Sequence, residues 1–141
     1  AISPIQVHLD GVLRASPMRL YLDEQRLSLA LVNIVRNAVQ AMYRGGELHV
    51  DGGQVDEEGA SWAWLAIRDT GEGMTEATLA RIFEPFFTTR STGSGMGLVI
   101  AKRILMEHGG KLEVTSRLGH GTTVTLKLPL RHDPEQDDLT Q

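Results

Sequence analysis

The sequence contains no cysteine, which excludes disulfides, thiolate metal sites and cysteine nucleophiles. It has no apolar run near the ~18 residues that a membrane span needs, and no basic segment followed by an apolar one indicates a secretion signal. A basic excess typical of nucleic-acid binders is also absent. The net charge is −4, and residues 131–141 contribute −3 of it through four acidic side chains against one arginine.

What remains is the composition of one ordinary globular domain. The chain has 141 residues, of which 41% are hydrophobic and 23% charged, enough for a single core. Glycine stands out, because 15 of 141 residues is about 11% against an average near 7%. We expect residues 1–131 to form the domain and the acidic residues 132–141 to be a disordered tail.

Hydrophobic periodicity predicts the order of helices and strands. The predicted strands cover residues 5–9, 18–22, 47–51, 62–69, 111–116 and 122–130. The predicted helices cover residues 24–42, 75–83 and 98–108, and Asp23 is the expected N-cap of the first. The polar, glycine-rich residues 52–61 are interpreted as a flexible hairpin loop. This order predicts an α+β fold, a two-layer sandwich with three helices on one face of a mixed, mostly antiparallel sheet.

The helix predicted over residues 24–42 carries a polar stripe. Asn33 and Asn37 are four residues apart, so their amides project together, with Arg36 and Gln40 beside them. Asparagine is a poor helix former, and its amide oxygen suits a hard cation such as Mg²⁺. A plain solvated helix face is the other interpretation, and these residues alone leave both open.

A second group of residues, Asp69-Thr70-Gly71-Glu72-Gly73, directly follows a predicted strand. A carboxylate there can accept a hydrogen bond from an exocyclic amino group, and the flanking glycines let a flat ring approach the backbone. A turn with a capping aspartate explains the same residues without a ligand.

A third group, Gly93, Gly95, Gly97 and Leu98, leads into the helix predicted over residues 98–108. Glycine at every second position exposes backbone N–H groups, and a helix N-terminus favours anions, so the segment is built as a phosphate cradle. It matches neither the dinucleotide fingerprint nor a P-loop. A flexible linker is the alternative, which the apolar Met96 and Leu98 disfavour.

The three phenylalanines Phe83, Phe86 and Phe87 precede this segment, followed by Arg90. They either fill the core beneath a loop or anchor a mobile lid whose Arg90 reaches a phosphate. The five histidines lie far apart in the chain and share no metal-ligand spacing, so the sequence predicts no histidine metal cluster. His108 is interpreted as a favourable charge at a helix C-terminus.

Together, the order and spacing of these motifs resemble the catalytic ATP-binding domain of sensor histidine kinases. Asn33-x-x-x-Asn37, Asp69-x-Gly71-x-Gly73, the Phe83–Phe87 segment and Gly93-x-Gly95-x-Gly97-Leu98 are similar to the family's N box, first glycine box, F box and second glycine box. The resemblance covers about residues 5–130 and is nearest to kinases of the nitrogen-regulation and oxygen-sensing type. It implies a Bergerat-type α/β sandwich that binds ATP and Mg²⁺.

The resemblance also implies roles for individual residues. Asn37 would hold Mg²⁺, with Asn33 and Arg36 near the phosphates, and Asp69 would receive the adenine amino group. Gly71 and Gly73 would line the ring, supported by the Thr122 hydroxyl. The phosphates would be contacted by residues of the second glycine box and the segment before it: Gly93, Gly95, Gly97, Leu98 and Arg90. Gln40 departs from the family, because many relatives place lysine there.

Related ATPases and serine kinases place glutamate four residues before the magnesium asparagine, as a general base. This chain has Asn33 there, whose amide has no useful basicity, whereas a histidine acceptor already carries a lone pair. The resemblance therefore implies a histidine kinase, with an anti-sigma-type serine kinase and a non-catalytic nucleotide-binding module as alternatives.

The phosphoacceptor motif of the family does not occur in this sequence. The expected partners are therefore a dimerisation and phosphoacceptor domain of the same kinase and a downstream response regulator. We expect this fragment to be a monomer in the bacterial cytoplasm, within a full-length homodimer whose membrane anchoring stays open.

Overall fold

The computed structural model describes residues 4–9, 22–89 and 95–130. These contain the elements β1 (Ile5–His8), α2 (Glu24–Ala41), β2 (Gly46–Glu57), β3 (Ala60–Asp69), α3 (Glu76–Leu79), α4 (Gly97–Glu107), β4 (Lys111–Arg117) and β5 (Gly121–Pro129). Nearly all of the strand predicted at residues 18–22 lies outside the described residues, as do the predicted tail at 132–141, Arg90 and Gly93.

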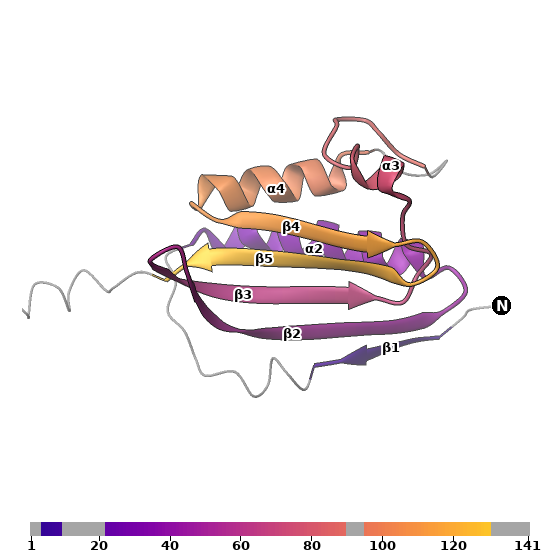
Figure 1. Ribbon diagram of the computed structural model, residues 1–141, viewed down its shortest axis with the longest axis horizontal. Helices are drawn as coiled ribbons and strands as arrows, with labels where there is room; N and C mark the ends of the chain where they lie inside the picture. The colour runs from indigo at the N-terminus through magenta and orange to yellow at the C-terminus, as the bar shows by residue number, and fades with distance from the viewer. Residues whose placement is uncertain (1–3, 10–21, 90–94, 131–141) are drawn as a thin grey trace, which may run out of the picture.

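The elements form a sandwich of one sheet and one helical layer (Figure 1). The five-stranded sheet has the order β1-β2-β3-β5-β4; β1 pairs with β2 in parallel, and the other neighbours are antiparallel. Helices α2 and α4 contact each other and lie against one face of the sheet. The α+β fold predicted from the sequence is confirmed. However, α3 is a single turn beyond the end of β4 and is shorter than the helix predicted over 75–83.

Helix α2 begins and faces the core for reasons visible in its sequence. The Asp23 carboxylate accepts hydrogen bonds from the N–H groups of Gln25 (3.1 Å) and Arg26 (3.2 Å), which caps the first turn as predicted. Ile34 and Ala38 repeat at the helical period and are buried against the sheet. Asn33 and Asn37 lie next to these buried positions on the helix and are themselves partly buried.

The core lies between the helices and the sheet. Ala30 of α2 and Ala101 of α4 are fully buried, and such small side chains let two helices approach closely. Strand residues that alternate toward the helices complete the core: Leu48, Ile67, Leu112, Val124, Leu126 and Leu128. This packing fixes the edge of α2 against the ends of β3 and β5.

The predicted flexible loop at residues 52–61 is wrong. Strands β2 and β3 continue through it, and the turn consists of Glu58 and Gly59 alone, both with positive φ (54° and 77°). Gly53 leaves room for Trp64, whose indole Nε1 would lie 3.1 Å from a Cβ atom added there. Gly53 therefore serves strand packing, and Gly59 supplies the positive φ of the turn.

An ionic contact on the sheet ties the tip of this hairpin to β5. The Lys127 ammonium lies 3.0 Å from Glu57 Oε2 and 3.3 Å from Glu113 Oε1. The hydrogen bond to Glu57 raises the pKa of Lys127 above its ordinary 10.5, and Glu113 adds to this, while burial opposes it. The ammonium is therefore charged throughout the neutral range and holds three strands together.

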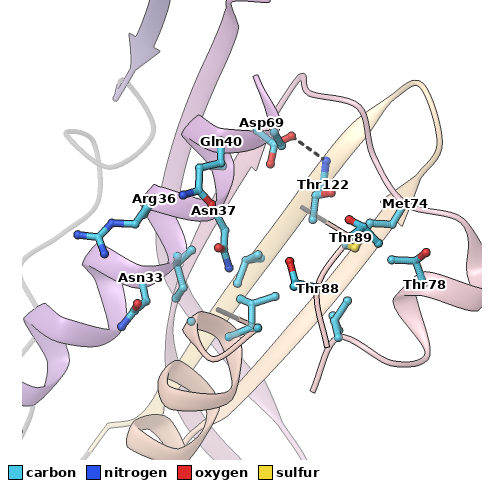
Figure 2. Close-up of a pocket in the computed structure, with 18 of the residues that line it drawn as sticks. Asn33, Arg36, Asn37, Gln40, Asp69, Met74, Thr78, Thr88, Thr89 and Thr122 are labelled. Atoms are coloured by element: carbon cyan, nitrogen blue, oxygen red, sulfur yellow. Dashed lines mark hydrogen bonds between the residues drawn. The ribbon is translucent and has the colours of Figure 1, made fainter. Parts of the chain in front are cut away.

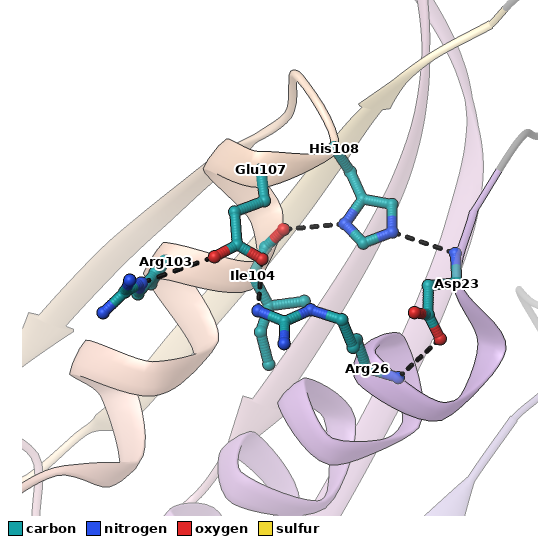
Figure 3. Close-up of polar contacts among 6 residues, drawn as sticks. All are labelled: Asp23, Arg26, Arg103, Ile104, Glu107 and His108. Atoms are coloured by element: carbon teal, nitrogen blue, oxygen red, sulfur yellow. Dashed lines mark hydrogen bonds and ion pairs between the residues drawn. The ribbon is translucent and has the colours of Figure 1, made fainter.

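A polar cluster joins the start of α2 to the end of α4 (Figure 3). The Asp23 N–H donates to His108 Nε2 (2.9 Å), and His108 Nδ1 donates to the Ile104 carbonyl (2.8 Å). Arg26 pairs with Glu107 beside them. Because Nε2 accepts a hydrogen bond, the ring is the neutral Nδ1–H tautomer in this arrangement. This corrects the sequence-based interpretation of His108 as a helix-terminal charge.

Replacing His108 by alanine is expected to lower the free energy of unfolding by about 1–2 kcal/mol, because both hydrogen bonds of the imidazole are lost. Urea unfolding at constant m-value measures the change. The matched control is His120→Ala in the exposed β4–β5 turn, where we expect less than about 0.5 kcal/mol. Equal stability of the two variants would show that the cluster does not hold the helices together.

Candidate functional site

A cavity of about 290 Å³ opens between α2, the ends of β3 and β5, and the segment from α3 to α4 (Figure 2). Its volume is near the lower end of the ~300–1,000 Å³ typical of small-molecule sites. Nine of the residues expected from the sequence to bind nucleotide or Mg²⁺ line it: Asn33, Arg36, Asn37, Asp69, Gly73, Gly95, Gly97, Leu98 and Thr122. Gln40, Glu72, Phe87 and Met96, which belong to the same sequence motifs, line it as well. The fold thus gathers three separate sequence motifs around one space.

Asp69 is the buried acid of this cavity, with 4% of its surface exposed. Its Oδ1 accepts hydrogen bonds from the N–H groups of Gly71 (2.9 Å) and Thr122 (3.2 Å; Figure 2). No other polar or charged side chain in the described part of the chain is buried to this degree. Two backbone donors thus fix the orientation of a carboxylate at the end of β3.

The backbone around Asp69 is too crowded for larger residues. Gly73 has φ +68° and Gly121 has φ +90°, and a Cβ atom at either would overlap a backbone carbonyl, that of Arg117 or of Asp69. Gly71 does not line the cavity; its N–H orients Asp69, and its Cα lies against Ala41 of α2. Gly71, Gly73 and Gly121 are therefore required chiefly because backbone packs closely against them, and this packing holds Asp69 in place.

Thr122 belongs to a hydroxyl network that the sequence analysis missed. Its Oγ1 lies 2.8 Å from Ser116 Oγ, which also accepts the Met74 N–H (2.9 Å) and donates to the Gly121 carbonyl (3.0 Å). Thr122 consequently donates to Ser116. Its hydroxyl is oriented beside Asp69 by a partner in β4.

Across the cavity, the two asparagines of α2 lie beside the start of α4. A Cβ atom on Gly97 would come 3.4 Å from Asn37 Nδ2 and 3.5 Å from Asn33 Oδ1. Asn37 points toward the middle of the cavity, whereas the Arg36 guanidinium lies on the outer side of α2 (Figure 2). The N-cap of α4, Met96, gives no side-chain capping bond, so the first turn presents its N–H groups and positive dipole end here.

The segment before α4 supplies the remaining wall. Phe83 packs against the core, Phe87 lines the cavity, and Phe86 is 76% exposed with φ +67°. The Phe86 N–H donates to the Gly95 carbonyl (3.2 Å), which ties this segment to the residues just before α4. Lining residues from here and from the cavity floor were not singled out from the sequence: Ile34, Ala38, Ile67, Met74, Thr78, Thr88, Thr89 and Val124.

The chemistry of the cavity changes from one end to the other. A fixed carboxylate lies at one end, apolar side chains such as Ile67 form the floor, and amides with a helix N-terminus lie at the other end. A flat ring with an amino donor fits the first two features, and an anionic group with a hard cation fits the third.

Comparison with known proteins gives one family and its relatives. Residues 22–132 match the family model of histidine kinase-, DNA gyrase B-, and HSP90-like ATPases. Sporulation kinase E of Bacillus subtilis is 34% identical over 96% of this chain and 18% of its own length. Sensor histidine kinase ZraS of Escherichia coli K12 is 38% identical over 80% of this chain and 24% of its own length. The chain thus spans less than a quarter of these relatives.

Solved structures give the same likeness. The mycobacterial sensor histidine kinase MprB superposes with a TM-score of 0.70 at 28% identity, over 92% of this chain and 83% of that one. A nucleotide-free catalytic domain of histidine kinase ThkA has a TM-score of 0.70 at 25% identity, over 92% and 79%.

Proposed function

This chain belongs to the family of histidine kinase-, DNA gyrase B-, and HSP90-like ATPases, as a histidine kinase catalytic ATP-binding domain, and we propose that it transfers the ATP γ-phosphoryl group to a histidine on a separate dimerisation domain. The proposed site is the cavity beside α2. The proposed partners are that dimerisation domain and a response regulator, with the reaction in the cytoplasm. Among the described helices, none is long and apolar enough to cross a membrane.

The observation that carries the proposal is the placement of Asp69 opposite Asn37. The buried carboxylate is held by two N–H groups, so it can accept from the adenine amino group without moving. Asn37, Asn33 and the α4 N-terminus supply amide oxygens and N–H donors about the place where phosphates would lie. The proposed ligand therefore matches both ends of the cavity.

Mg²⁺ fits the donor set, because it prefers oxygen ligands and retains waters, and Asn37 would hold it. When bound, it would neutralise charge on the phosphates. The chain itself positions the nucleotide: Asp69 sets the ring, the α4 N–H groups set the phosphates, and the apolar floor excludes water. Arg90 and Gly93, which lie outside the described residues, are proposed as further phosphate contacts.

The accepting histidine comes from outside the cavity. No histidine is among the described residues that line it, and the position of the glutamate base in related serine kinases, four residues before Asn37, holds Asn33. A neutral imidazole forms its N–P bond with its own lone pair while the bond to the β,γ-bridging oxygen breaks and ADP leaves with the electron pair. Catalysis then rests on positioning and charge neutralisation.

Calorimetric titration of the chain with ATP, in Mg²⁺ and in EDTA, tests the proposal. We expect one nucleotide per chain, with tighter binding in Mg²⁺ and weaker binding of GTP, whose ring has an oxygen in place of the amino donor. A folded chain that binds no ATP at millimolar concentration would contradict the proposal.

A further inference from the structure

Pairing of β1 with β2 brings together two histidines that are 41 residues apart in the sequence. His8 is the register partner of His49 in the parallel pair, and Glu47 lies two residues before His49. Leu48 between them is buried toward the helices, so Glu47 and His49 project from the opposite face of the sheet. We propose that His8, Glu47 and His49 bind one divalent transition-metal ion, with Zn²⁺ as the best match.

The ligand atoms of the three side chains lie close together. One atom from each lies within 4.8 Å of the others: His49 Nε2 is 3.1 Å from Glu47 Oε2, and His8 Nε2 is 3.7 Å from Glu47 Oε1. His8 Nε2 is buried and has no hydrogen-bond partner among the described residues. A buried nitrogen without a partner is costly, and a metal ion would give it one.

The donor set decides the kind of ion. Two imidazoles and one carboxylate suit Zn²⁺ and its neighbours in the first transition row, whereas Mg²⁺ and Ca²⁺ prefer oxygen ligands alone. The two rings are stacked, with centroids 4.5 Å apart and planes 9° apart, so one must rotate about χ2 for both lone pairs to meet one ion. A water can take the fourth tetrahedral position.

The site has a clear structural consequence. Strand β1 is the edge of the sheet, and in the described part of the chain its strand pairing is with β2 alone. An ion held by His8 and His49 would fasten β1 to β2. The proposed nucleotide cavity lies on the helical side of the sheet, so the metal site stands independently of the proposed function.

Titration of the nucleotide-free chain with zinc chloride at pH 7.5, followed by calorimetry, tests the inference. We expect one ion per chain, a higher thermal unfolding midpoint in its presence, and at least about tenfold weaker binding in His8→Gln and in His49→Gln. His120→Gln, which alters an exposed histidine elsewhere, should bind as the wild type does.

Two results would overturn the inference. One is that the wild type binds no zinc with one-to-one stoichiometry; the other is that His8→Gln and His49→Gln bind zinc as tightly as the control His120→Gln. Unfolding without zinc checks that each variant keeps its fold. Glu47→Gln gives an independent arm, because it removes the carboxylate and keeps both imidazoles; unchanged affinity in this variant would also count against the proposed ligand set.

Discussion

Replacing Asp69 by asparagine is expected to weaken ATP binding by at least about 100-fold, because an acceptor becomes a donor at a site fixed by the backbone. The new amide has nearly the same shape, and its oxygen can still accept from the N–H groups of Gly71 and Thr122. Its NH₂ group then faces the cavity, where the adenine amino group also donates. Two donors without an acceptor between them oppose binding. Calorimetry with ATP measures the loss.

The same variant gives a sharper readout in its base preference. Inosine triphosphate carries a carbonyl acceptor where ATP carries the amino donor, so the new amide can pair with it. We expect the wild type to prefer ATP strongly and the Asp69→Asn variant to lose or reverse that preference. A variant that merely unfolded would lose both ligands, so this comparison separates damage to the fold from a change in recognition. Unchanged ATP affinity would place the adenine elsewhere.

The fold was predictable wherever the local pattern and the tertiary environment agree. The helix after Asp23 has a cap and a regular apolar stripe, and the structure confirms it. The flexible loop predicted at residues 52–61 was wrong because the turn of this hairpin, Glu58-Gly59, lacks the usual asparagine or aspartate at the first position. Gly53 weakens a strand locally but accommodates Trp64 from the neighbouring strand. That Trp64 lies opposite Gly53 follows from the register of β2 and β3 and is not visible in the local sequence.

The residues of the candidate site also differ in whether a local sequence pattern or the pairing of strands determines their position. Asn33 and Asn37 are neighbours on a helix and Asp69 follows a strand directly, so each is visible as a local pattern, and the resemblance to sensor histidine kinases gave these patterns their roles. Ser116 reaches Thr122 only because β4 pairs with β5, and His8 reaches His49 only because β1 pairs with β2. Side chains joined by strand pairing carry no spacing signal. The local pattern therefore shows residues on single elements, whereas the Ser116–Thr122 and His8–His49 contacts come only from strand pairing.

Replacing Asn37 by alanine is expected to remove most of the Mg²⁺ dependence of ATP binding and to slow phosphotransfer by about 10²–10³-fold. In the wild type, Mg²⁺ in place of EDTA should tighten ATP binding about tenfold or more, within the usual range of coupling between two ligands. Without the Asn37 oxygen, that ratio should approach one, while the affinity for ATP in EDTA changes little because Asp69 still holds the ring.

Paired titrations in Mg²⁺ and in EDTA measure the ratio, and single-turnover phosphohistidine formation measures the rate once the chain is joined to its dimerisation domain. Alanine is the better helix former, so α2 should stay folded. Val32→Ala is the matched control, because it makes a comparable truncation at a half-exposed position of α2 outside the cavity. If Asn37→Ala keeps the wild-type ratio of ATP affinity in Mg²⁺ to that in EDTA, and the wild-type phosphotransfer rate, then Asn37 does not bind the Mg²⁺. If Asn37→Ala loses the effect of Mg²⁺ on ATP affinity and Asp69→Asn changes the preference between ATP and inosine triphosphate, the ring lies at the Asp69 end of the cavity. The phosphates then lie at the Asn37 end.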